Sequence, residues 1–126
     1  MNKTRLALIQ MKMSSNKEKN LAKAISKIKI AKKKGANIVS TRASFPSTVY
    51  PWKRVAEEFS AEVRLAEHDE NYYTKVDDIL DLIDKDTAVV TLSHVEYACG
   101  QRYNLESFSK AVHDVGALFI VDATQS

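Results

Sequence analysis

The sequence contains only one cysteine, two prolines and three glycines in 126 residues. The single cysteine, Cys99, excludes a disulfide framework and a metal site built from several thiolates. No apolar run approaches the ~20 residues with which a helix spans a membrane. Residues 5–10 are also too short and too quickly polar to form the core of a signal peptide. We therefore expect a cytoplasmic protein without a membrane-spanning segment and without a metal site.

Acidic residues are almost missing from the N-terminal part of the chain. Residues 1–40 hold 11 lysines and arginines against one acidic residue, Glu18. The remaining residues hold eight basic and 15 acidic side chains, so that the net charge is only +3 at pH 7. Such asymmetry indicates either a basic arm for nucleic acid or membrane surfaces, or two parts of different origin.

The lysines of residues 17–34 belong to a predicted amphipathic helix. Its apolar residues follow the spacing i, i+3, i+4, i+7, and they are Leu21, Ala24, Ile25, Ile28 and Ala31. The opposite face is nearly all lysine and lacks the interleaved aromatic residues of a nucleic-acid platform. A solvated face is the simpler interpretation, and polyanion or nucleic-acid binding through helix 17–34 is the alternative.

Predicted strands and helices alternate strictly along the chain. The strands are residues 5–11, 36–40, 62–65, 87–92 and 117–121, and the helices are 17–34, 48–60, 75–84 and 105–115. Short links between alternating elements favour a parallel sheet with helices on both faces. We therefore predict a single α/β domain over residues 1–126: a three-layer sandwich with a five-stranded, mainly parallel, Rossmann-like or flavodoxin-like sheet.

The stretch 116–126 ends an apolar run, 117–121, with the polar residues Asp122, Thr124 and Gln125. Open α/β sheets bind ligands at the carboxyl ends of their parallel strands. These polar residues are therefore candidates for a binding site. The alternative is that Asp122 and Thr124 only cap the turn that leaves the strand.

Two short stretches carry a first family resemblance: Ala-Leu-Ile-Gln-Met at 7–11 and Lys-Gly-Ala-Asn-Ile-Val at 34–39. With them, residues 1–40 resemble the start of a nitrilase-superfamily amidohydrolase of the carbamoylputrescine amidohydrolase branch. In that family the second strand leads to the glutamate of a Glu-Lys-Cys triad, and Ala43 stands at this position. The family's lysine and cysteine lie beyond the matched stretch, and Cys99 has no neighbouring base or cation to form a thiolate.

Three other stretches carry a second resemblance: residues 45–52 (FPSTVYPW), 92–97 (LSHVEY) and 121–126 (VDATQS). In this order they resemble the class V aminotransferases, which are pyridoxal-phosphate (PLP) enzymes of fold type I and include cysteine desulfurases and kynureninases. The resemblance covers residues 37–126.

The second resemblance implies a role for several residues. Asp122 would pair with the protonated pyridine nitrogen of PLP, Gln125 would reach the ring hydroxyl, and Phe45 would stack on the ring. His94 and Tyr97 would lie near the cofactor, although Tyr97 stands where the desulfurases carry asparagine. Phe45 as a core residue, His94 as a loop histidine and Gln125 as a solvent-exposed residue are the structural alternatives.

The matched stretch lacks the family's Schiff-base lysine, which follows the Asp-Ala-Thr-Gln motif, and the turn that holds the cofactor phosphate. Residues 1–40 and 37–126 also resemble different families and share only Asn-Ile-Val-Ser at 37–40. We therefore interpret the chain as a recombined or engineered chimera, a folded scaffold without catalytic residues. No cofactor is expected on this interpretation. Residual PLP or phosphate-ligand binding at Asp122, Gln125, Phe45 and His94 is the alternative.

The second resemblance implies the order 3-2-4-5 for the last four strands. With the first strand inserted between strands 2 and 4, the favoured order is 3-2-1-4-5, because strands joined by one helix usually pair. Strand 1 at an edge of the sheet, or swapped between two chains, is the rival. No predicted helix follows the fifth strand to cover its side of the sheet. We therefore expect an exposed apolar patch beside this strand, and a homodimer that buries it.

Overall fold

The computed structural model describes residues 36–126, in which strands and helices alternate. The elements are β1 (Asn37–Thr41), α2 (Pro46–Phe59), β2 (Glu62–Ala66), α3 (Val76–Leu80), β3 (Thr87–Ser93), α4 (Leu105–Asp114) and β4 (Leu118–Asp122). Every strand and helix predicted in this range is present. The predicted first strand, 5–11, and the lysine-rich helix, 17–34, lie outside the described residues, and polyanion binding through that helix stays a prediction.

Helix α3 is shorter than the predicted helix 75–84. After Leu80 the chain continues in tight turns, in which the amides of Leu82 and Ile83 donate to carbonyls three residues back. Asp84 then turns away to accept hydrogen bonds from Asn37 Nδ2 at 2.9 Å and Arg64 Nη1 at 2.6 Å. These polar contacts at the start of β1 compete with continuation of the helix, which the apolar spacing alone does not reveal.

The four strands form one parallel sheet in the order β2-β1-β3-β4. Strand β1 is hydrogen-bonded to β3 directly, with Ile38 opposite Val89 and Val39 opposite Val90. The prediction that another strand inserts between these two is therefore wrong. All five residues of β1 are buried, as expected for a central strand of a sheet covered on both faces.

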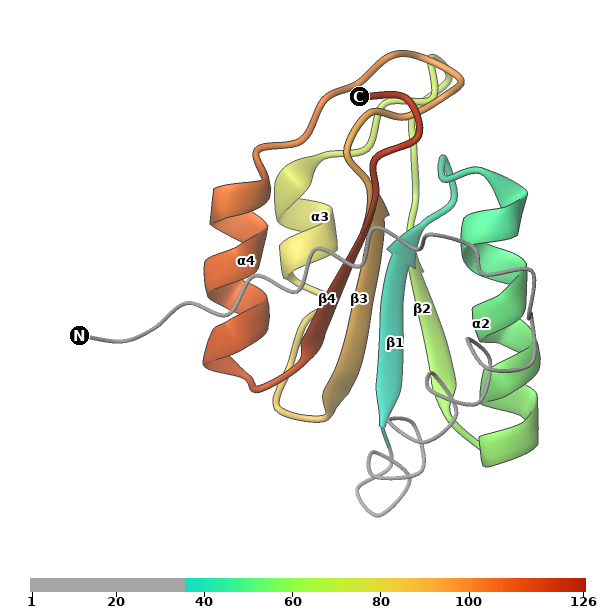
Figure 1. Ribbon diagram of the computed structural model, residues 1–126, viewed down its shortest axis with the longest axis vertical. Helices are drawn as coiled ribbons and strands as arrows, with labels where there is room; N and C mark the ends of the chain where they lie inside the picture. Colours follow the sequence, from blue (N-terminus) through green and yellow to red (C-terminus); the bar gives the residue numbers. More distant parts are fainter. Residues whose placement is uncertain (1–35) are drawn as a thin grey trace.

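The helices lie on both faces of the sheet, and Figure 1 shows α2 on one side and α3 and α4 on the other. Ile38 and Val89 point to the α2 side, where they pack with Ala56 of that helix. The larger cluster on the opposite face is formed by side chains of the strands, of α3 and α4, and of the loops: Val39, Ala66, Ile79, Val90, Leu92, Tyr103, Phe108, Val112, Ala117 and Phe119. The predicted α/β fold with a parallel sheet and helices on both faces is thus confirmed.

Helix α4 has well-defined ends. Asn104 caps its start, because its side chain accepts a hydrogen bond from the Glu106 amide at 3.0 Å. At its end Gly116 has φ +74°, and the amides of Gly116 and Ala117 donate to the carbonyls of His113 and Val112. This double hydrogen bond is the Schellman arrangement, which turns the chain into β4.

The large apolar side chains of β4 are not exposed. Among residues 36–126 the exposed ones lie elsewhere: Phe45, Tyr50, Tyr72, Tyr73, Val76 and Tyr97. Phe119 of β4 is buried, and Leu118, Ile120 and Val121 are half-buried. On β4 itself the predicted apolar patch is half-buried, and the homodimer expected to bury it stays a prediction. Of the helices in the described part of the chain, none is both long and apolar enough to cross a bilayer.

Candidate functional site

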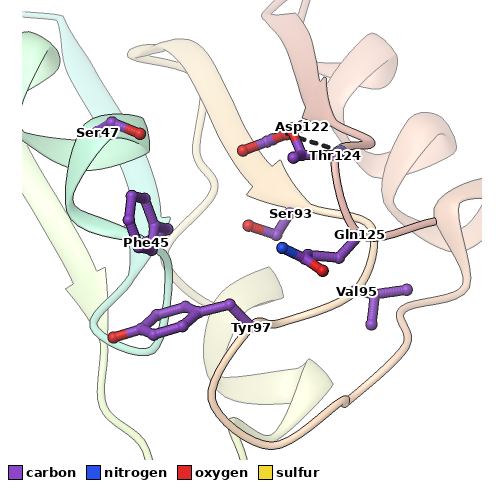
Figure 2. A pocket seen from close by; sticks show the side chains of 8 residues that line it. All are labelled: Phe45, Ser47, Ser93, Val95, Tyr97, Asp122, Thr124 and Gln125. Atoms are coloured by element: carbon purple, nitrogen blue, oxygen red, sulfur yellow. Dashed lines mark hydrogen bonds between the residues drawn. The ribbon is translucent and has the colours of Figure 1, made fainter.

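The carboxyl ends of β1, β3 and β4 lie at the same edge of the sheet (Figure 1). Their loops surround a hollow of about 260 Å³, and Figure 2 shows the side chains that line it. Its lining comes from the loop after β1 and the start of α2, from β3 and the loop after it, and from β4 and the last residues: Phe45, Ser47, Ser93, Val95, Tyr97, Asp122, Thr124 and Gln125. This is the position at which open α/β sheets bind ligands.

Asp122, the last residue of β4, presents its carboxylate to this hollow. Its Oδ1 atom accepts hydrogen bonds from the amide nitrogen of Thr124, at 2.9 Å, and from the Thr124 hydroxyl. Its Oδ2 atom accepts a hydrogen bond from the Thr48 hydroxyl of α2 at 3.1 Å. Partial burial raises the pKa of Asp122, but the hydrogen bonds from Thr124 and Thr48 outweigh it and lower the pKa below its usual value.

Asp122 keeps some capacity for a ligand. A carboxylate offers about four acceptor positions, and the three hydrogen bonds from Thr124 and Thr48 occupy three of them. An ionised carboxylate with a free acceptor position, half-buried beside a hollow, can bind a cationic N–H group through a charge-assisted hydrogen bond.

Two aromatic side chains form a wall of the hollow, and Figure 2 shows their rings close to each other. Phe45 precedes α2, and Tyr97 lies in the loop after β3. Their ring centroids are 4.9 Å apart with an interplanar angle of 89°, an edge-to-face contact. Phe45 is 47% exposed and Tyr97 is 52% exposed, so that both rings are available to a flat ligand.

Gln125 lies on the opposite side of the hollow from Phe45, with its amide directed into the space between the loops (Figure 2). Among the residues that the structure describes, no side chain or backbone group is hydrogen-bonded to this amide. It can therefore donate to and accept from a bound molecule. Ser93 at the end of β3 and Ser47 at the start of α2 add hydroxyl groups, and the sequence did not single them out because a serine at the end of an element carries no distinctive signal.

His94 does not line the hollow, unlike the other three candidate residues Phe45, Asp122 and Gln125. Its ring lies between Ser126 and Arg102: Nδ1 is 2.8 Å from the Ser126 hydroxyl, and Nε2 accepts a hydrogen bond from Arg102 Nε at 3.2 Å. Within residues 36–126 no group of three His, Cys, Asp or Glu side chains could hold a metal ion.

Glu96 lies beneath the aromatic wall and is completely buried. Its Oε1 atom accepts hydrogen bonds from the hydroxyls of Thr41, at 3.1 Å, and Ser44, at 3.2 Å. Sequence reasoning missed this residue, because a glutamate in a loop is usually an exposed charge. Only the structure reveals that its side chain turns inward.

Known proteins resemble this chain over most of its length. A probable cysteine desulfurase of Methanothermobacter thermautotrophicus is 34% identical over 94 residues, which are 75% of this chain and 23% of that protein. A kynureninase of Burkholderia pseudomallei is 30% identical over 89 residues, 71% of this chain and 20% of that protein. The crystal structure of the cysteine desulfurase CsdA from Escherichia coli shares the fold, with a TM-score of 0.66 and 20% identity over 80% of this chain and 27% of that chain.

This chain therefore spans between a fifth and a quarter of the length of these two curated relatives. The family model of the class V aminotransferases matches residues 14–126. The match takes in most of the stretch 1–40, for which a nitrilase origin was predicted, and the comparisons give that origin no support. The likeness to cysteine desulfurases and kynureninases predicted for residues 37–126 is confirmed. The chain belongs to the class V aminotransferase family.

Proposed function

We propose that this chain supplies the ring-binding part of a PLP site in a protein of the cysteine desulfurase and kynureninase type. One observation carries the proposal: the Asp122 carboxylate, with a lowered pKa and a free acceptor position, lines the same hollow as the exposed ring of Phe45. A carboxylate and an aromatic face are the two groups that recognise a protonated pyridine ring.

In this proposal Asp122 holds a proton on the pyridine nitrogen of the cofactor. Thr124 and Thr48 fix the carboxylate and keep it ionised through their hydrogen bonds. Phe45 contributes a flat apolar surface, and the Gln125 amide contributes a donor to an oxygen of the ring. PLP, when bound, acts as an electron sink for amino-acid substrates.

The activity of a whole protein of this family is a further step. The named relatives lead us to propose amino-acid chemistry of the cysteine desulfurase or kynureninase type for the protein to which this segment corresponds. A recombined fragment without catalytic activity remains the competing hypothesis for the 126-residue chain. Turnover of cysteine or kynurenine by the purified chain would contradict that hypothesis.

Calorimetric titration with pyridoxine 5′-phosphate tests the binding site. This ligand has the ring and the phosphate of PLP but no aldehyde, so that it cannot react with surface lysines. Saturable binding that Asp122→Asn weakens at least tenfold supports the proposal. The matched control is Asp114→Asn, because Asp114 is exposed at the end of α4 and lies outside the hollow. Absence of binding, or equal binding by all three proteins, contradicts it.

A further inference from the structure

The buried carboxyl group of Glu96 connects two loops that are distant in the sequence. Its Oε1 atom accepts hydrogen bonds from Thr41, the last residue of β1, and from Ser44 in the loop that follows. The two hydroxyls also lie 3.0 Å from each other, and the Ser44 amide donates to Thr41 Oγ1 at 3.1 Å. The three oxygens form a compact triangle with no exposed member, since all three residues are buried.

Backbone hydrogen bonds also hold Glu96 in place. Its amide donates to the Gln101 carbonyl at 2.9 Å, and its carbonyl accepts from the Gly100 amide at 2.8 Å. Val95 and Arg102 form an isolated antiparallel bridge beside it. The loop after β3 is thus closed at its base, and the Glu96 side chain has one fixed direction, toward the loop after β1.

The aromatic wall follows directly from these two anchor points. Phe45 comes immediately after Ser44, and Tyr97 comes immediately after Glu96. The hydrogen bond from Ser44 to Glu96 therefore fixes the backbone positions from which the two rings meet, with their centroids 4.9 Å apart. Because both rings are about half exposed, packing alone restrains them weakly, and the buried anchor determines their position.

The surroundings of Glu96 favour its uncharged form. Burial raises its pKa, and the nearby hydroxyls of Thr41, Ser44, Tyr103 and Ser93 lower it by less, so that the pKa lies above its usual value. None of these four side chains is a cation. The Oε2 atom has no hydrogen-bond partner among residues 36–126. An uncharged acid, unlike a carboxylate, can occupy such a place without an opposing charge.

We propose that Glu96 is a positioning residue of the candidate site: its buried carboxyl group joins the loops after β1 and β3 and thereby holds the aromatic wall of Phe45 and Tyr97. The inference rests on the proposed function in one respect, since the wall is the surface offered to the cofactor ring. Glu96 itself does not line the hollow and acts only through its two neighbours.

Proton NMR of the full chain tests the positioning role of Glu96, because the nuclear Overhauser effect between the rings of Phe45 and Tyr97 reports their contact. Glu96→Gln keeps an acceptor oxygen and no charge, and we expect it to retain the ring contact. Glu96→Leu fills a similar volume without an acceptor, and we expect it to lose the ring contact. We also expect it to weaken the binding of pyridoxine 5′-phosphate about tenfold, which is the scale of one lost hydrogen bond. Retention of the contact in Glu96→Leu would show that volume alone suffices, and it would overturn the proposal.

A smaller substitution tests the role of Glu96 if Glu96→Leu does not fold. Ser44→Ala removes one hydroxyl of the triangle, and its control is Ser109→Ala, because Ser44 and Ser109 are each 6% exposed. Within residues 36–126 the Ser109 hydroxyl is hydrogen-bonded only to His113 in α4, away from the site. We expect Ser44→Ala to weaken the ring contact and Ser109→Ala to leave it unchanged. Equal effects of the two variants would overturn the proposal.

Ligand binding and the ring contact test the proposed function and the role of Glu96 separately. If the parent chain does not bind pyridoxine 5′-phosphate, the proposed function fails, while the ring contact in the Glu96 and Ser44 variants still decides the role of Glu96. If the parent binds and the contact survives in Glu96→Leu and Ser44→Ala, only the positioning role fails.

Discussion

The Thr48 hydroxyl of α2 donates a hydrogen bond to the Oδ2 atom of Asp122 at the end of β4, over a distance of 3.1 Å. The two residues lie 74 positions apart in the sequence. The start of a helix on one face of the sheet is thereby tied to the tip of an edge strand. Burial raises the pKa of Asp122, and the hydrogen bonds from Thr124, together with this one from Thr48, outweigh burial and lower the pKa below its usual value.

Replacing Thr48 by valine removes this hydrogen bond at nearly constant volume. We expect the pKa of Asp122 to rise and the free energy of unfolding at pH 7 to fall by about 1 kcal/mol. A group with a lowered pKa stabilises the fold above its unfolded pKa, and this contribution is lost as the pH falls through its folded pKa. The difference in the free energy of unfolding between parent and variant should therefore diminish in acid. Urea unfolding at several pH values measures this difference.

The control for this variant is Thr91→Val. Thr91 is buried, whereas Thr48 is half-buried, and the Thr91 hydroxyl has no hydrogen-bond partner among residues 36–126. Replacing an unsatisfied buried hydroxyl by a methyl group should leave the stability unchanged or increase it. If Thr48→Val and Thr91→Val have the same effect, the hydrogen bond to Asp122 contributes nothing.

Glu96 has the opposite pH dependence, because its pKa is raised by burial. A group with a raised pKa binds its proton more tightly in the folded state, so that its contribution is present below the unfolded pKa and declines as the pH rises through the folded pKa. Glu96→Gln abolishes this titration. We expect the stability of Glu96→Gln relative to the parent to increase from pH 4 to pH 8, as followed by urea unfolding; parallel curves would contradict it.

The chain leaves α2 and α4 through residues with the same left-handed backbone conformation but different side chains. Gly116 after α4 and Ser60 after α2 both have a left-handed backbone, with φ +74° and +55°. An ideal Cβ on Gly116 has no heavy atom within 4 Å, so that Gly116→Ala should cost about 1–2 kcal/mol for backbone reasons alone. Ser60→Gly should stabilise the fold by about 0.5–1 kcal/mol. Thermal unfolding measures both, and Gly116→Asn, which tolerates this conformation better, is the control.

Association of two copies through the β4 side stays a prediction. Among the described strands, β4 pairs only with β3, and its other edge offers backbone groups that a second chain could use. We expect light scattering to give the mass of a dimer at high concentration, and Ile120→Lys to shift it toward the monomer. A monomer at every concentration contradicts the prediction.

The elements were predictable because their periodicities are strong. The run of apolar residues before Asp122 predicts a strand and places polar groups at its tip, and this is where the structure has Asp122, Thr124 and Gln125. The order of the four described strands is the one that the family resemblance implied, but the place of the first strand was not predictable from periodicity. The preference for pairing consecutive strands led to an insertion beside β1, whereas the place is taken by β3.

The site was only partly predictable, and the residues that were missed share one property. Their side-chain direction depends on contacts between distant loops. His94 follows a strand as Asp122 does, yet Ser126 and Arg102 hold its ring. Glu96 looks like an exposed charge until Thr41 and Ser44 are brought to it by the fold. No local pattern records such contacts.

The strand order β2-β1-β3-β4 also determines when the sheet can be completed during synthesis. Of the four described strands, β1 and β2 leave the ribosome first. They can pair with each other as soon as α2, which connects them, has formed. The opposite edge of β1 then stays open until β3 emerges, which at roughly 5–20 residues per second takes a few seconds. For that interval β1, all five residues of which are buried in the finished fold, presents an unpaired edge that another chain could pair with.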